Sequence, residues 1–123
     1  MLTTQDRTEA QAAALFKALA HPVRIAILDV LRHGEECVCH LEAILGKRQA
    51  YISQQLAVLR AAQIITDRRD GMNSFYLVVH PEIYALLDAA RAVRGGANAA
   101  PTAPIRRESC PCPKCAPVAV VAD

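Results

Sequence analysis

The chain has 123 residues, enough for one compact domain and a short appendage, and this length excludes a second catalytic domain. Its net charge of +2 is too small to identify a nucleic-acid-binding protein, so the placement of the charges must decide that question. With 53% hydrophobic residues the chain can build a core without covalent staples, so its five cysteines do not resemble a secreted disulfide scaffold. The absence of a signal-peptide pattern and of a membrane-length apolar run predicts a cytoplasmic protein with no membrane partner.

Two parts of the chain differ in composition. Residues 1–94 carry helix and strand patterns, whereas Gly95 and Gly96 open a stretch rich in Ala, Pro and Asn that has neither. We therefore expect one domain over residues 1–94 and a flexible C-terminal tail containing Cys and Pro over residues 95–123.

Four helices are predicted before the first strand. Apolar residues at helical spacing indicate a first helix that ends near His21, because Pro22 disfavours helical geometry in the residue before it. Pro22 can then begin a second helix, apolar on nearly all sides, that ends at Gly34. A short third helix ends at Gly46, and a fourth follows over residues 49–62. The last two helices are therefore joined by a tight glycine turn.

A hairpin and a last helix follow. Two β-prone runs, at residues 64–66 and 74–79, flank a polar stretch whose Asp-Gly and Asn residues favour a hairpin. The helix over residues 81–94 has an apolar stripe wider than so small a domain can cover, so we expect a partner subunit to cover it. The order of elements predicts a mainly α fold with a small β-hairpin, a dimeric winged helix-turn-helix.

The fourth helix and the hairpin carry side chains suited to DNA. Glutamine can pair bidentately with adenine, serine can bond to base edges, and tyrosine could reach a base methyl group or a phosphate. Lysine and arginine would bind the flanking phosphates. The candidate DNA-binding residues are Lys47, Arg48, Gln49, Tyr51, Ser53, Gln54, Gln55, Arg68 and Arg69. For any one of them alone, an ordinary solvated helix or turn is the alternative.

Three motifs in this order resemble the ArsR/SmtB family of metal-sensing repressors. They are Leu15–Ile25 (LFKALAHPVRI), Glu36–Leu41 (ECVCHL) and Tyr51–Arg60 (YISQQLAVLR), and the resemblance covers about residues 9–94. It implies a homodimer, joined mainly through the first and last helices, that binds an inverted-repeat operator and is released by a metal or metalloid ion. The residues expected at this dimer interface are Leu15, Phe16, Leu19, Ile83, Leu86, Leu87 and Ala90.

The five cysteines fall in two clusters, and clustered thiolates select thiophilic ions. The first cluster is Cys37-Val38-Cys39. An i, i+2 pair points to different faces of a regular helix, so we expect the binding of one ion by both thiols to need a distorted helix start. Such a distortion would shift the DNA-binding helix and weaken DNA affinity. Two small buried side chains with only a packing role are the alternative.

The second cluster lies in the tail and comprises Cys110, Cys112 and Cys115. Prolines between these cysteines keep the segment out of helices and strand ladders, so the thiols can converge on an ion. The tail either closes the Cys37/Cys39 site, from the same or the other subunit, or forms its own site. An inert extension is the alternative.

The resemblance also bears on the inducer. Cys-Val-Cys at this position resembles the family's site for As(III) and Sb(III), and also its site for Cd(II) and Pb(II). The arsenic form often has a third cysteine three residues on, where this chain has Glu42. The positions that resemble the family's last-helix zinc site hold Val78, His80, Arg91 and Arg94. Only His80 could bind zinc there, so we expect that site to be absent, and His40 beside Cys39 is a further candidate ligand.

We therefore expect a metal- or metalloid-responsive repressor, not an enzyme, with arsenite or antimonite as inducer, Cd(II) or Pb(II) as the alternative, and no organic cofactor. A three-sulfur site suits As(III), whereas a fourth thiolate suits Cd(II). Hypotheses of another class are a cysteine redox switch and a thiol metal carrier without operator binding. The sequence has no Cys-x-x-Cys that opens a helix on a βαβ unit, no set of nucleophile, base and orienting group, and no phosphate loop, so nothing in it indicates an enzyme.

Overall fold

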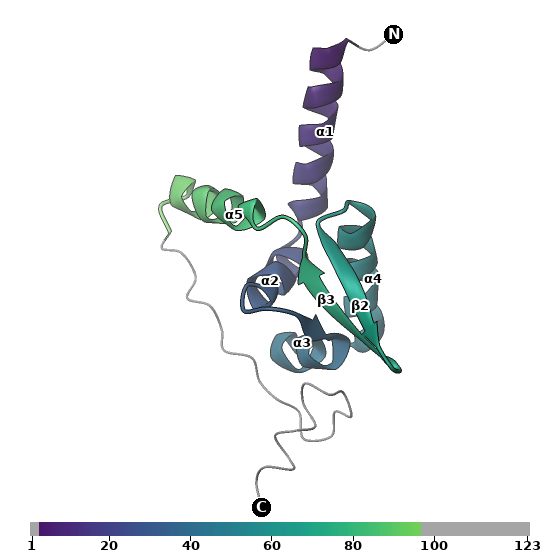
Figure 1. Cartoon of the computed structure of the whole chain (residues 1–123). Coiled ribbons are helices and arrows are strands. Elements are labelled where there is room, and N and C mark those ends of the chain that lie inside the picture. The colour runs from purple at the N-terminus through teal and green to yellow at the C-terminus, as the bar shows by residue number, and fades with distance from the viewer. Residues whose placement is uncertain (1–2, 97–123) are drawn as a thin grey trace, which may run out of the picture.

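The computed structural model describes residues 3–96, so most of the predicted tail, including Cys110, Cys112 and Cys115, lies outside the described residues. The described part is mainly helical with one small sheet (Figure 1). Its elements are α1 (Thr4–Leu19), α2 (Pro22–Leu31), β1 (Glu36–Cys37), α3 (Val38–Leu45), α4 (Gln49–Ala61), β2 (Ile65–Asp70), β3 (Asn73–Val78) and α5 (Glu82–Val93). Every helix among residues 3–96 is too short or too polar to span a lipid bilayer.

The helix boundaries follow from capping chemistry. α1 begins with a capping box in which Thr3 and Asp6 bond each other's backbone N–H groups, both at 3.1 Å. α2 begins at Pro22, and the Nδ1 atom of His21 accepts a hydrogen bond from the backbone N–H of Val23, the second residue of the helix. α2 ends at Leu31, three residues before the predicted glycine. The break between the first two helices confirms the reading of Pro22.

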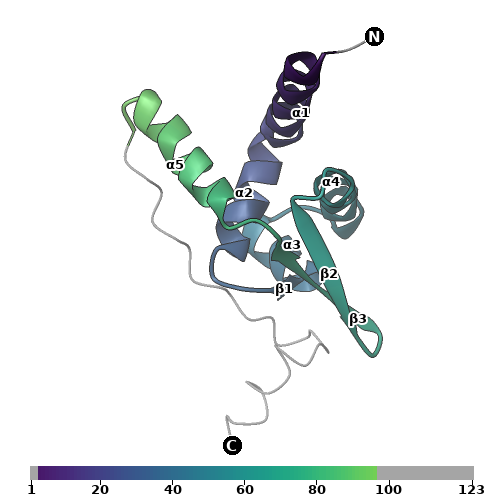
Figure 2. The ribbon, with the colours of Figure 1, turned by 45° about the horizontal axis from the view of Figure 1, so that its top comes forward.

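The sheet has the strand order β1-β3-β2, with both pairs antiparallel. β2 and β3 form the predicted hairpin, which projects from the domain (Figure 2). β1 was not predicted. It has only two residues, too few for an alternating pattern, and it is defined by pairing of Glu36 with Tyr76 and of Cys37 with Phe75.

The core lies between α2, α3, α4 and the sheet. Its fully buried apolar side chains are Ile27, Leu28, Leu41, Ile52, Leu56, Leu59, Ile65 and Phe75. Burial of one such side chain stabilises the fold by roughly 1.5–3 kcal/mol. Three of them form one stripe of α4, so packing on the core determines which face of α4 remains on the surface.

α1 and α5 extend away from this core (Figure 1 and Figure 2). Three of the residues predicted at a dimer interface, Leu19, Ile83 and Leu87, are each only 5% exposed and belong to the core of the subunit. Their apolar character therefore stabilises this chain and does not require a partner, which corrects the prediction for these positions. Phe16 is 54% exposed and Ala90 is exposed, so these two remain accessible to a partner.

Charged side chains hold α5 against α2. Arg32 donates two bonds to the Asp88 carboxylate, at 3.0 and 3.2 Å, and Arg91 donates to Asp29 at 3.1 Å. Arg32 also lies over the Tyr84 ring, 4.5 Å from its centroid. The Arg32 guanidinium lowers the pKa of the Asp88 carboxyl from its ordinary value. This α2–α5 clamp sets the direction of α5.

We expect Asp88→Asn to lower the melting temperature at neutral pH, because it removes the carboxylate charge that Arg32 binds. The folded-state pKa of Asp88 is depressed, so its stabilisation is present above the ordinary aspartate pKa of about 3.9 and is lost as the pH falls through the folded pKa. The deficit of the variant should therefore shrink in acid. Thermal unfolding followed by circular dichroism measures it, with the exposed Asp70→Asn as control. A deficit of equal size at neutral and acidic pH would contradict this role.

Candidate nucleic-acid interface and thiol pair

The outer face of α4 carries the predicted base-contacting residues. Ile52, Leu56 and Leu59 pack into the core, so Gln49, Ser53 and Gln54 are exposed on the opposite side. Lys47 and Arg48 are also exposed, in the turn that leads into α4. This turn is tight because Gly46 adopts left-handed backbone geometry, with φ of 65°, at the end of α3. The arrangement presents a polar helix face with positive charge at its start.

Gln55 does not belong to this outer face. It is only 8% exposed, and its Oε1 atom accepts a hydrogen bond of 2.8 Å from Arg24 Nε. Arg24 also donates to the carbonyl of Ala18 at 3.1 Å, so the three residues connect α1, α2 and α4. The predicted base contact of Gln55 is therefore wrong. Its spacing gave the signal, since residue 55 lies three after Ile52 and four before Leu59, within the buried stripe.

Tyr51 lies between the outer and core-facing sides of α4. It is half-buried, and its hydroxyl is 3.3 Å from Nε2 of His21. Because His21 caps the start of α2, this contact fixes the beginning of α4 against α2. No pattern in the sequence indicates this pairing, which joins residues 30 positions apart.

The hairpin carries two further positive charges, on Arg68 and Arg69 of β2. Arg68 donates to both carboxylate oxygens of Glu35, at 2.6 and 3.2 Å, and lies over the Phe75 ring, 4.9 Å from its centroid. The bond to Glu35 raises the pKa of Arg68. The positive charge of Arg68 is therefore paired with a carboxylate within the domain. Arg69 is exposed beside it. The two arginines thus differ, and Arg69 presents its charge to solvent more freely.

The sulfur atoms of Cys37 and Cys39 lie 2.6 Å apart. Cys37 ends β1 and has extended backbone geometry, with φ of −86° and ψ of 164°, whereas Cys39 is the second residue of α3. A strand residue followed by a helix residue brings together two side chains that a regular helix would separate. The expectation that shared ligation needs a distorted helix start is therefore wrong, because the strand-to-helix junction already provides the convergence.

A cavity of about 260 Å³ borders the thiol pair. It is lined by Cys37, Val38, Cys39, Gln49, Met72, Asn73, Ser74 and Tyr76. It therefore connects the thiols with the first residue of α4 and with the turn of the hairpin. Among residues 3–96, no three His, Cys, Asp or Glu side chains come together in a way that could hold a metal ion. Of these four residue types, only Cys37 and Cys39 are among the described residues that line the cavity.

A buried polar contact spans the thiol pair. His40 Nδ1 lies 2.8 Å from Glu36 Oε2, and both side chains are fully buried. The sequence indicated His40 as a candidate metal ligand, and the structure directs its Nδ1 atom to Glu36. Glu36 was missed, although its place four residues before a histidine in an apolar segment is a usable signal. The contact ties β1 to α3 across the two cysteines.

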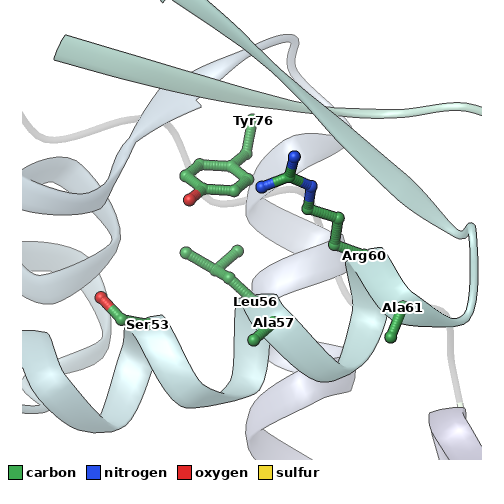
Figure 3. A pocket seen from close by; sticks show the side chains of 6 residues that line it. All are labelled: Ser53, Leu56, Ala57, Arg60, Ala61 and Tyr76. Carbon is green, nitrogen blue, oxygen red and sulfur yellow. The ribbon is translucent and has the colours of Figure 1, made fainter.

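A second hollow, of about 400 Å³, lies between α4 and β3. Figure 3 shows Ser53 and Leu56 on α4 facing Tyr76 of β3, with the Arg60 side chain beside the tyrosine ring. Arg60 binds Asp67 of β2 at 3.2 Å, so it also joins α4 to the hairpin. Tyr76 lines both this hollow and the cavity at the thiol pair.

Comparison with known proteins agrees with this geometry. The family model described as "Bacterial regulatory protein, arsR family" matches residues 21–67, from α2 into β2. The biofilm growth-associated repressor of Agrobacterium fabrum is 38% identical over 92 residues, which cover 75% of this chain and 79% of that protein. The chain belongs to the ArsR family. It is a transcriptional repressor of the ArsR/SmtB type and not an enzyme, as the sequence predicted.

Solved structures confirm the winged helix-turn-helix fold of this ArsR-family chain. NolR from Sinorhizobium fredii aligns with a TM-score of 0.68 and 33% identity, over 79% of this chain and 98% of NolR. The homodimeric winged helix-turn-helix DNA-binding domain of Mb0332 from Mycobacterium bovis aligns with a TM-score of 0.68 and 25% identity, over 77% of this chain and 88% of that one. In this chain α3 and α4 are therefore the helix-turn-helix, and the β2–β3 hairpin is the wing.

Proposed function

We propose that this ArsR-family repressor acts in the cytoplasm as a homodimer that binds an inverted-repeat operator and is released by a thiophilic ion at Cys37 and Cys39. Arsenite or antimonite is the inducer we favour, with Cd(II) or Pb(II) as the alternative. The observation that carries the proposal is the position of the thiol pair, which shares one cavity with Gln49 of α4 and with the tip of the wing. An ion bound there touches both elements that contact DNA in this fold.

On the DNA side, we propose that Gln49, Ser53 and Gln54 contact base edges in the major groove. Their support is exposure on the face of α4 opposite to the core. The side chains proposed to bind phosphates are Lys47, Arg48, Arg68 and Arg69. Gln55 is left out because it is bonded to Arg24 inside the domain.

The homodimer is supported by the two helices that extend from the core. Leu15 and Leu86 are half-buried and border a cavity of about 300 Å³ between α1, α5 and the end of α4. Phe16 and Ala90 are exposed nearby on the same two helices. Covering such apolar surface is a strong driving force for association. A two-fold dimer would present two α4 helices, which is the geometry that an inverted repeat requires.

Release follows from where the ion would act. Cys37 is held in β1 by pairing with Phe75, and Cys39 belongs to α3, so an ion that sets the distance between their sulfurs also sets the angle between strand and helix. α3 is joined to α4 by the tight turn at Gly46. A change at the start of α3 would therefore move α4 relative to the wing. The ion favours the form that binds DNA less tightly, by a coupling of typically 1–3 kcal/mol.

The number of sulfurs decides between the inducers. Clustered thiolates favour soft ions, and three thiolates suit As(III) whereas four suit Cd(II). We propose that Cys110, Cys112 and Cys115 of the tail provide the thiolates beyond Cys37 and Cys39, from the same or the other subunit. This assignment rests on their spacing in the sequence, because they lie outside the described residues.

We expect the double variant Cys37→Ser, Cys39→Ser to bind operator DNA as the unchanged chain does, but to remain bound when arsenite is added. Neither thiol is among the proposed DNA contacts, and Cys37 is buried, so their loss should spare DNA binding and remove only the coupling. Fluorescence anisotropy with a duplex selected from a random pool measures both properties. The triple tail variant Cys110→Ser, Cys112→Ser, Cys115→Ser is measured beside it, and we expect it to weaken release by arsenite, because these cysteines are proposed to complete the site. Normal release of the double variant by arsenite would show that the inducing ion does not bind at Cys37 and Cys39.

We expect Gln54→Ala to weaken discrimination between the operator and a duplex with one changed base pair, by about 1–3 kcal/mol if Gln54 makes a bidentate base contact. Gln55→Ala is the control, since Gln55 is bonded to Arg24 within the domain. That variant should lower the melting temperature and leave discrimination unchanged. Competition binding with matched and mismatched duplexes gives the comparison. A loss of discrimination in Gln55→Ala but not in Gln54→Ala would reverse the two roles.

A cysteine redox switch is the second candidate function, because the two sulfur atoms already lie 2.6 Å apart. Peroxide could convert two thiols to one disulfide and two water molecules, and so act on the same junction. Release by peroxide in the absence of any metal, and its reversal by a dithiol, would favour this function over ion sensing. A metal carrier without operator binding has no support in the comparisons, because the chain belongs to a family of transcriptional regulators.

A further inference from the structure

Arg24, in the first turn of α2, bonds to both α1 and α4. Its Nε atom donates to Oε1 of Gln55 at 2.8 Å. Its Nη1 atom donates to the carbonyl oxygens of Ala18 and Lys17, at 3.1 and 3.5 Å. These carbonyls belong to the last turn of α1, where backbone carbonyls lack the usual helical partner. One planar guanidinium therefore connects the end of α1 to the middle of α4.

A second polar contact joins α2 and α4 one turn away. Nε2 of His21, the residue that caps α2, lies 3.3 Å from the hydroxyl of Tyr51. Tyr51 and Gln55 are four residues apart on α4, and His21 and Arg24 are three apart at the start of α2. Residues at these spacings lie on one side of a helix. α4 is thus held at two points, which fixes its rotation about its own axis relative to α2.

The direction of α1 depends on its C-terminal end. Of the 16 residues of α1, only Ala18 and Leu19 are buried, and both lie in its last turn. The rest of the helix extends away from the domain (Figure 1). The connection to α2 is only two residues long, Ala20 and His21. The bonds from Arg24 therefore act at the point where the direction of α1 is set.

This direction matters because α1 is one of the two helices proposed to join the subunits. In a two-fold dimer, the angle between α1 and α4 determines the distance between the two α4 helices and how they face the DNA. One base pair added between two half-sites moves one of them by about 3.4 Å and turns it by about 35° around the duplex. A firm link between α1 and α4 makes the dimer reject such a change, whereas a loose link lets α4 follow the groove.

We propose that Arg24 is a positioning residue that sets the half-site spacing of the operator, by fixing α4 to the end of α1 through Gln55 and Ala18. The inference rests on the homodimer of the proposed function and adds the residue that determines which spacing the homodimer accepts. Arg24 acts without touching DNA, since it is half-buried and donates to groups within the domain. It selects operators by their geometry and not by their base sequence.

The test compares duplexes that differ only in half-site spacing. The duplex selected from a random pool is lengthened or shortened between its half-sites by single base pairs, and fluorescence anisotropy gives the dissociation constants. We expect a change of one base pair to weaken binding by the unchanged chain by at least about tenfold, because protein or DNA must deform to absorb the misfit. Arg24→Met keeps a long side chain and removes the bonds to both helices, so this penalty should fall to about threefold or less.

Two further variants break the same link in other ways. Gln55→Ala removes it from the α4 side and should reduce the spacing penalty less, because Arg24 keeps its bonds to α1. Arg24→Lys keeps the charge but cannot bond to both helices through one planar group, so its penalty should also fall. Should Arg24→Met not fold, these two variants provide the test.

Arg60→Met is the matched control. It also removes an arginine bond of α4, but this bond joins α4 to Asp67 of the hairpin and leaves the link to α1 intact. We expect its spacing penalty to equal that of the unchanged chain, even if its melting temperature falls. A penalty reduced in Arg60→Met as much as in Arg24→Met would overturn the inference, since any loosened α4 would then behave alike.

The outcomes separate this inference from the proposed function. If the Arg24 and Gln55 variants keep the full spacing penalty, the role of Arg24 is overturned and the homodimer stands. Light scattering on the unchanged chain gives its oligomeric state. A monomeric chain, or one that binds every spacing equally well, would overturn the proposed homodimer on an inverted repeat, and the role of Arg24 with it.

Discussion

The change from strand to helix between Cys37 and Val38 is the feature on which the other functional features depend. Pairing with β3 holds Cys37 extended, and the next residue begins α3. The two thiols meet because the backbone changes its geometry between them, and the buried contact of Glu36 with His40 spans the same junction. A site that relies on a junction of two elements is sensitive to their relative position, which is the property a sensor requires.

The same junction lies next to both parts of the DNA-binding unit. The cavity at the thiols reaches Gln49 of α4 and the turn of the wing, and Tyr76 separates it from the hollow beneath Ser53. Polar contacts hold α4 in place, with Tyr51 bonded to His21 in its first turn and Gln55 bonded to Arg24 in its middle. The start of α4 is therefore positioned by a polar contact and also borders the cavity through Gln49. Under the proposed function, ion capture would need to alter only this local balance to change the fit to DNA.

Much of the fold follows from sequence patterns of known physical origin. The break at Pro22, the turn at Gly46 and the Asp-Gly hairpin each constrain the backbone locally, and the structure has all three. The hairpin strands are longer than predicted, because β2 continues to Asp70 through the stretch that was expected to be the connecting turn. β1 was not predictable, since it exists only through its pairing with β3. The helix-based view of the thiol pair failed for the same reason, because Cys37 takes its geometry from a distant strand. Local patterns do not contain such long-range constraints.

Side-chain roles were harder to predict than elements. Leu19, Ile83 and Leu87 were read as interface residues because their helices are apolar, yet the core of the subunit covers them. Apolar periodicity indicates that a face is buried but not by which partner. Gln55 shows the converse, since a polar residue within a buried stripe needs a bonding partner, here Arg24, that the sequence places 31 residues away.

The most direct measurement of the coupling between sulfur and DNA is the dissociation constant of the fully reduced chain for its selected duplex, with and without saturating arsenite. We expect the constant to rise by about 5- to 150-fold on addition of arsenite, as a coupling of 1–3 kcal/mol requires. A constant that stayed the same with arsenite, antimonite, Cd(II) and Pb(II) alike would contradict that coupling.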